Sequence, residues 1–150
     1  MRWLIVAFLV FAPRLAMAAD SRGYIAIITG ECKLSLLDNF VPCNSKVVNT
    51  VANGHLSMIF HQDRFVFLLE GSSDRQPNLE NYYMSVSQFT ILEKNKAIAT
   101  DTSMEGECHM SLNAEGSELY YIYCDIYDRS KGALFRFHLD NIISTDRQPL

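Results

Sequence analysis

The sequence lacks the short motifs that mark the common catalytic sites. It has no Gly-x-Ser-x-Gly nucleophile elbow, no glycine-rich phosphate loop, no His-Glu-x-x-His zinc motif and no Cys-x-x-Cys redox pair. A run of basic residues is also missing, and 13 Lys and Arg against 17 Asp and Glu leave a net charge of −4. Because nucleic acid binds to a concentrated positive surface, nucleic-acid binding is not expected.

Three further absences concern the architecture of the protein and its cellular localisation. No segment has a helical period over eleven residues, which argues against amphipathic helices. No Gly/Ser/Pro-rich stretch separates two parts, so a flexible linker between domains is not expected. The sequence contains no Asn-x-Ser/Thr acceptor for glycosylation, which favours a bacterial periplasmic protein over a eukaryotic secreted one.

Residues 1–18 have the pattern of a secretory signal peptide. Arg2 precedes an unbroken apolar run from Trp3 to Phe11, and residues 16–18 read Ala-Met-Ala, as signal peptidase requires. The run is far shorter than the roughly 20 residues that span a bilayer. We therefore expect a periplasmic or secreted protein with no transmembrane segment after cleavage.

The remaining 132 residues, 19–150, have the length of one domain and contain repeated landmarks in the same order. Gly-Glu-Cys-x-x-Ser-Leu occurs at 30–36 and 106–112, Phe-His-x-Asp at 60–63 and 137–140, and Asp-Arg-Gln-Pro at 74–77 and 146–149. Such self-similarity predicts a tandem duplication. Repeat one covers about 24–77, a connecting strand about 78–96 and repeat two about 97–149, with one core shared by both.

Four cysteines in an exported chain predict two disulfides. The duplication selects one of the three pairings, Cys32 with Cys43 and Cys108 with Cys124, each inside its own repeat. Free buried thiols are the alternative, which export disfavours. Separations of 11 and 16 residues do not resemble the paired ligands of a zinc site. No cofactor is expected.

Most of the chain has the composition of short strands separated by turns. Asn53-Gly54 is the strongest hairpin signal. The segments rich in β-branched and aromatic residues are Tyr24–Thr29, Lys33–Leu37, Lys46–Ala52, Leu56–Phe60, Arg64–Leu69, Tyr82–Leu92, His109–Leu112, Leu119–Tyr127 and Ala133–Leu139. This pattern predicts an all-β domain, an antiparallel sandwich or barrel built from two pseudo-repeats and stapled by the two disulfides.

One predicted strand carries the best candidate binding residues. Between Leu119 and Tyr127, alternation assigns Tyr120, Ile122, Cys124 and Ile126 to the interior, and Leu119, Tyr121, Tyr123, Asp125 and Tyr127 to the outside. Tyrosine combines a large apolar ring with a polar tip, which suits a contact surface. We therefore predict binding by Tyr121, Tyr123 and Tyr127. The competing interpretation is that this stripe packs under a neighbouring loop or sheet.

The repeated His-x-Asp pairs are weaker candidates for metal binding or base catalysis. Period-two geometry places His61 beside Asp63 and His138 beside Asp140, and a carboxylate can orient an imidazole for either chemistry. Aspartate is also common in turns at strand ends, which is the structural alternative. The two Asp-Arg-Gln-Pro copies are predicted to be structural turns, with recognition of an anionic group as their functional alternative.

The sequence as a whole favours a non-enzymatic, exported binding module that contacts a protein or an envelope glycan through a sheet face. A small periplasmic hydrolase or metal-binding protein built on the His-x-Asp pairs is one alternative. A structural envelope component that assembles through exposed strand edges is the other. The oligomeric state is left open.

Overall fold

A computed structural model describes residues 23–150 except 53–54, 63, 95 and 129–131. The predicted signal peptide, the Asn53-Gly54 turn and Asp63 therefore lie outside the described residues. The described chain forms ten strands: β1 (Tyr24–Leu36), β2 (Asn39–Val41), β3 (Lys46–Ala52), β4 (His55–His61), β5 (Phe65–Asn78), β6 (Asn81–Glu93), β7 (Lys96–Asp101), β8 (Met104–Leu112), β9 (Leu119–Asp128) and β10 (Gly132–Pro149). All strand pairs are antiparallel, which confirms the all-β prediction.

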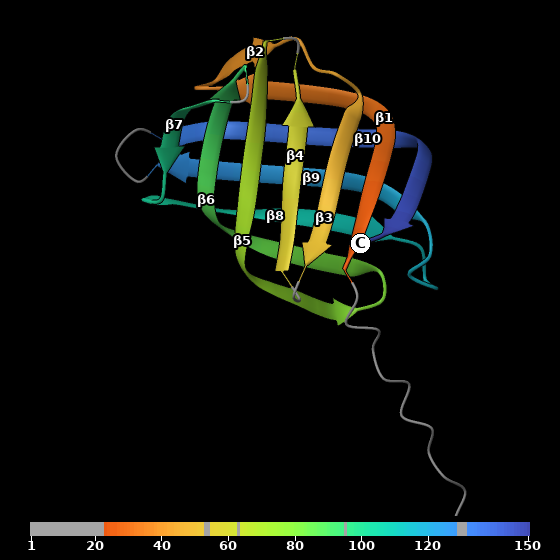
Figure 1. The fold of residues 1–150 in the computed structure, drawn as a ribbon. Helices are drawn as coiled ribbons and strands as arrows, with labels where there is room; N and C mark the ends of the chain where they lie inside the picture. The colour runs from red at the N-terminus through yellow and green to blue at the C-terminus, as the bar shows by residue number, and fades with distance from the viewer. Residues whose placement is uncertain (1–22, 53–54, 63, 95, 129–131) are drawn as a thin grey trace, which may run out of the picture.

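The fold is a closed eight-stranded barrel. The strands follow the order β1-β3-β4-β5-β6-β8-β9-β10, and β10 closes the ring by pairing with β1. The short strands β2 and β7 lie outside this ring, against β1 and β6. Figure 1 shows β3 to β6 on one side of the barrel and β8 to β10 crossing behind them at a steep angle. The long strands bend from one side to the other, which is how the sheet closes.

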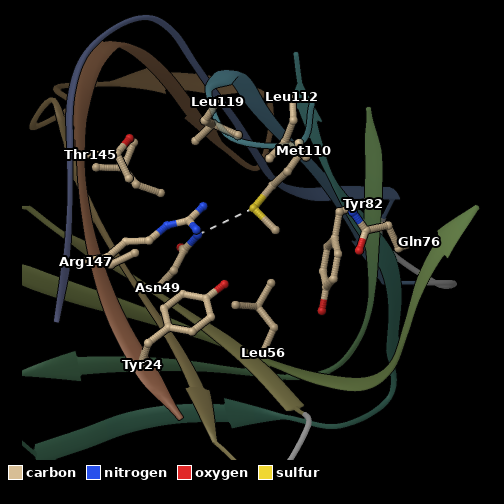
Figure 2. Close-up of a pocket in the computed structure, with 13 residues that line it drawn as sticks. Tyr24, Asn49, Leu56, Gln76, Tyr82, Met110, Leu112, Leu119, Thr145 and Arg147 are labelled. Atoms are coloured by element: carbon tan, nitrogen blue, oxygen red, sulfur yellow. Dashed lines mark hydrogen bonds between the residues drawn. The ribbon is translucent and has the colours of Figure 1, made fainter. Parts of the chain in front are cut away.

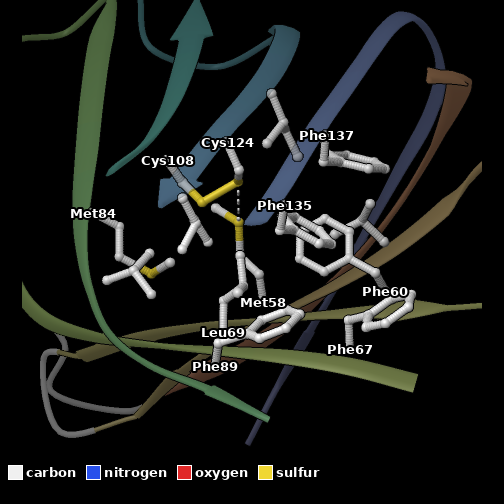
Figure 3. Close-up of a cluster of buried hydrophobic side chains, with 14 of the residues drawn as sticks. Met58, Phe60, Phe67, Leu69, Met84, Phe89, Cys108, Cys124, Phe135 and Phe137 are labelled. Atoms are coloured by element: carbon white, nitrogen blue, oxygen red, sulfur yellow. Dashed lines mark hydrogen bonds between the residues drawn. A yellow bond between two sulfur atoms is a disulfide. The ribbon is translucent and has the colours of Figure 1, made fainter. Parts of the chain in front are cut away.

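Phenylalanine side chains fill the middle of the barrel. Phe60 of β4 contacts Phe137 of β10, with ring centroids 4.4 Å apart, and both rings are buried. Phe67, Phe89 and Phe135 complete the cluster (Figure 3). An eight-stranded barrel is just wide enough for side chains to fill it, so alternate residues of every strand build this core.

Both predicted disulfides are present. Cys108 of β8 and Cys124 of β9 lie directly opposite each other, are bonded, and are completely buried among the core side chains (Figure 3). Cys32 of β1 is bonded to Cys43, which follows β2 and is only partly buried. One disulfide therefore belongs to the core, and the other holds a surface segment against β1.

A β-bulge corrects part of the alternation predicted for β9. Ile122, Cys124 and Ile126 are buried as predicted. Ser111 pairs with Tyr121, but Leu112 pairs with Leu119, so β9 contains one extra residue at this point. The bulge reverses the faces before Tyr121. Tyr120 is consequently 56% exposed and Leu119 lies in the interior, so the assignment of these two residues was wrong.

The two Asp-Arg-Gln-Pro segments are strand ends and not the predicted turns. One ends β5 beside β6, and the other ends β10 beside β1. Asp74 pairs with buried Met84, whereas Arg147 pairs with buried Ala26. Paired residues on neighbouring strands face the same side of the sheet. A one-residue difference in register therefore moves every side chain of a strand to the opposite face. Asp74 of one copy and Arg147 of the other therefore point toward the inside of the barrel, where Asp74 is partly buried and Arg147 remains exposed at the open end.

Candidate outer-face binding site

A row of aromatic and basic side chains crosses the outer face of the barrel. One residue from each of six neighbouring strands lies at the same register, and we call this set the aromatic row: Arg75, Tyr83, His109, Tyr123, His138 and Lys33, from β5, β6, β8, β9, β10 and β1. Side chains at paired positions on one face are close enough to interact. The row places the predicted Tyr123 and His138 side by side.

Ring contacts join the members of the row. The Arg75 guanidinium lies 3.8 Å from the centroid of the Tyr83 ring, within the range of a cation–π interaction. Tyr83 and His109 are stacked, with centroids 4.3 Å apart. Tyr121 and Tyr123 each meet the His138 ring edge to face, at 6.0 and 6.1 Å. Tyr121 thus belongs to the same surface although it lies one step along β9.

His109 is held as a neutral ring at the centre of this surface. Its Nε2 lies 2.8 Å from Asn81 Oδ1 and its Nδ1 lies 3.2 Å from the Tyr121 hydroxyl. The tautomer that satisfies both contacts has Nε2–H donating to Asn81 and the Tyr121 hydroxyl donating to Nδ1. Partial burial lowers the pKa of His109. The nearby Glu107 carboxylate opposes this shift and Arg75 adds to it.

The lowered pKa of His109 predicts a loss of stability at mildly acid pH. The unfolded chain binds a proton at this position near pH 6.5, and the folded chain does so only at lower pH. The melting temperature should therefore fall as pH decreases below about 6.5, and it should fall less in His109→Gln. Thermal unfolding monitored by circular dichroism between neutral and acid pH measures both slopes. A steeper acid loss in the variant would contradict this account.

A shallow groove runs beside the row along β8, β9 and β10. It has a volume of about 550 Å³ and is lined by His109, Tyr120, Tyr121, Tyr123, His138, Asp140 and Asn141. Tyr120 and Tyr123 are 56% and 39% exposed, so their rings are accessible from solvent. Asp140 Oδ2 lies 3.7 Å from His138 Nε2 on the groove wall. The groove therefore combines accessible rings with an imidazole, a carboxylate and an amide.

No family model matches this chain, and no curated protein and no solved structure matches it. In the described part of the chain, no helix is long and apolar enough to cross a membrane.

The structure separates the three predicted tyrosines. Tyr121 and Tyr123 lie in the groove. Tyr127 is 42% exposed on the same strand, but it pairs with Glu105 farther along β9 and does not line the groove. Sequence reasoning missed His109, Tyr120 and Asn141. His109 occupies the position that Lys33 has in the other Gly-Glu-Cys copy. This difference between the two copies was the one feature of the sequence that could have pointed to His109.

The two histidines of the His-x-Asp pairs lie on strands that do not pair with each other. His138 and Asp140 lie on the groove, in the middle of β10. His61 ends β4, a strand that pairs with β3 and β5, and its partner Asp63 is outside the described residues. Among the residues that the structure describes, no group of three or more His, Cys, Asp and Glu side chains could hold a metal ion.

Two arginines, Arg75 in the row and Arg136 next to it, are paired with carboxylates. Arg75 contacts Glu107 at 2.9 Å, and Arg136 contacts Asp125 at 3.0 Å and Asp38 at 3.6 Å. The hydrogen bond to Asp125 raises the pKa of Arg136. Burial, and after it the Asp125 carboxylate, raises the pKa of the Tyr123 hydroxyl, which keeps this phenol protonated at neutral pH. The Tyr123 hydroxyl is itself hydrogen-bonded to Asp125, so Tyr123 presents mainly its exposed ring to the groove.

Proposed function

We propose that this protein is an exported, non-enzymatic binding module that holds an envelope glycan in the groove along β8, β9 and β10. The observation that carries the proposal is the alignment of accessible tyrosine rings with polar side chains in one shallow groove. Tyr120 and Tyr123 supply the rings, and Asp140 and Asn141 supply hydrogen-bonding groups at the edge.

The chemistry of the groove matches a sugar better than a peptide surface. A pyranose ring presents a face of C–H groups, which packs on a tyrosine ring, and a rim of hydroxyls, which bind carboxylates and amides. Two arginines of this surface are already paired, Arg75 with Glu107 and Arg136 with Asp125. This pairing favours an uncharged ligand, because a charged partner would have to compete for those side chains.

The two disulfides support a localisation outside the cytosol. Disulfides persist in the periplasm and in secreted proteins and are rare in reducing compartments. Together with the signal-peptide pattern of residues 1–18, the bonds Cys32–Cys43 and Cys108–Cys124 favour a periplasmic or secreted protein, where envelope glycans are accessible.

Replacing one exposed ring that lines the groove tests the proposal. Purified mature protein should bind at least one polymer on an array of envelope polysaccharides and peptidoglycan fragments. Tyr123→Ala should weaken this binding by at least about tenfold, because central aromatic side chains contribute most of the binding energy at such sites. Tyr127→Ala is the matched control, since it removes the same ring at similar exposure from the same strand. Its binding should be unchanged.

Two outcomes would contradict the glycan assignment. Equal weakening by Tyr123→Ala and Tyr127→Ala would show that the groove is not the site. Capture of a protein from an envelope extract that depends on Tyr123, with no retention on any glycan, would assign the same face to a protein partner.

A further inference from the structure

A second hollow lies inside one end of the barrel, away from the outer groove. Its volume is about 220 Å³. Figure 2 shows side chains from several strands converging on it. Apolar side chains cover much of its wall: Ala26, Ile28, Leu56, Met110, Leu112 and Leu119. The mouth of a barrel is a common place for a small-molecule site, and this space equals roughly seven water molecules at liquid density.

Asn49 is the unusual residue of this cavity. Its side chain is only 4% exposed and its Oδ1 has no hydrogen-bond partner. Its Nδ2 is 3.5 Å from Met110 Sδ, which is a weak acceptor (Figure 2). Leaving a buried amide oxygen unpaired is unfavourable, and such groups in native proteins call for an explanation. A ligand that donates a hydrogen bond to Asn49 would supply one.

Arg147 provides a cation at the same place. Asn49 and Arg147 both pair with Ala26, one on each side of it, and all three residues line the cavity. The Arg147 guanidinium lies 5.5 Å from the centroid of the Tyr24 ring and forms no ion pair with a carboxylate of the described residues. Strands are about 4.8 Å apart, so one small ligand in the cavity can contact both Asn49 and Arg147.

We propose that this cavity binds a small organic carboxylate with a hydrogen-bond donor next to its charge and a short apolar tail. The carboxylate accepts hydrogen bonds from Arg147, as guanidinium geometry favours. The adjacent hydroxyl or ammonium group donates to Asn49 Oδ1. The tail packs against Met110, Leu112 and Leu119. This site is independent of the glycan groove on the outer face.

Three molecules of matched size separate these contributions. 2-Hydroxy-4-methylpentanoate carries charge, donor and tail, 4-methylpentanoate lacks the donor, and 4-methylpentan-1-ol lacks the charge. In two-dimensional NMR titrations of the ¹⁵N-labelled protein, the hydroxy acid should bind most tightly and the alcohol most weakly. The largest saturable shifts should include the Asn49 side-chain amide and the backbone around Ala26.

The duplicated motif supplies the matched control variant. Arg147→Gln should weaken binding of the hydroxy acid by at least about tenfold, because the charged hydrogen bonds are lost. Arg75→Gln changes the same residue of the other Asp-Arg-Gln-Pro copy, which faces outward over Tyr83, and should leave this binding unchanged. Asn49→Ala should remove the advantage of the hydroxy acid over 4-methylpentanoate.

The proposal is overturned if the hydroxy acid causes no saturable shifts at millimolar concentration. Equal affinity for the acid and the alcohol, or for wild type and Arg147→Gln, would overturn it as well. Tyr123→Ala should leave these titrations unchanged, so failure of the cavity site and failure of the glycan site are distinguishable.

Discussion

Replacing both Cys108 and Cys124 with alanine is expected to lower the free energy of unfolding by about 5 kcal/mol. Closing a loop of this length contributes about 3 kcal/mol, and the remainder comes from the space that two buried sulfur atoms leave. Both cysteines are completely buried, and Cys124 Sγ lies 3.9 Å from Met58 Sδ. Since a domain is stable by only about 5–15 kcal/mol, the variant should be close to unfolding at body temperature.

The surface disulfide is the control for this experiment. Cys32→Ala with Cys43→Ala opens a loop of similar length, 11 residues of separation against 16. Its loss should be about 3 kcal/mol, because little core packing is removed. Urea denaturation followed by far-UV circular dichroism gives the free energy of unfolding of both variants. Equal losses in the two variants would show that the buried sulfurs add no packing energy beyond loop closure.

The features that could be predicted from the sequence are those coded by nearby residues. Alternation within β9 identified the buried Ile122, Cys124 and Ile126, because side chains of a strand face opposite sides in turn. The cysteine pairing followed from the order of the repeated landmarks. Both conclusions require only the local pattern or the internal comparison, and neither requires knowledge of which strands are neighbours.

The candidate site depends on register, which the sequence does not reveal. The aromatic row exists because five strand pairings align Arg75, Tyr83, His109, Tyr123, His138 and Lys33. A shift of one residue in any pairing would move a side chain to the other face. The bulge at Tyr120 is a second example, since a single extra residue exposes one ring that alternation assigns to the core.

Register also decides which way the side chains of the two Asp-Arg-Gln-Pro copies face. The two copies have the same sequence, but β5 and β10 pair with their neighbours in different registers. A given residue of the motif therefore faces opposite sides of the sheet in the two copies. Asp74 and Arg147 face inward, while Arg75 and Asp146 face outward. The identical sequence therefore provides an internal control, because the Asp and the Arg of the motif each face the inside of the barrel in one copy and the outside in the other.

Asp74 connects strands that have separated from each other. Beyond Glu70, β5 no longer pairs with β4. Across the resulting gap, Asp74 Oδ2 accepts hydrogen bonds from the Leu56 N–H at 3.1 Å and from the Tyr82 hydroxyl at 2.6 Å. Burial, followed by the hydrogen bond to Asp74, raises the pKa of Tyr82, so this hydroxyl remains a donor at all ordinary pH values. One carboxylate oxygen thus joins β4, β5 and β6.

Asp74→Ala is accordingly expected to lower the free energy of unfolding by about 3 kcal/mol, because a buried hydroxyl and a backbone N–H lose their charged acceptor. Asp146→Ala makes the same substitution in the other copy, where the carboxylate is exposed and accepts a hydrogen bond from Gln148 at 3.3 Å. Its effect should stay within about 0.5 kcal/mol. Urea denaturation of the two variants side by side measures the difference. Similar losses at both positions would mean that the motif acts through its strand-end backbone, and that the inward-facing carboxylate does not hold the separated strands together.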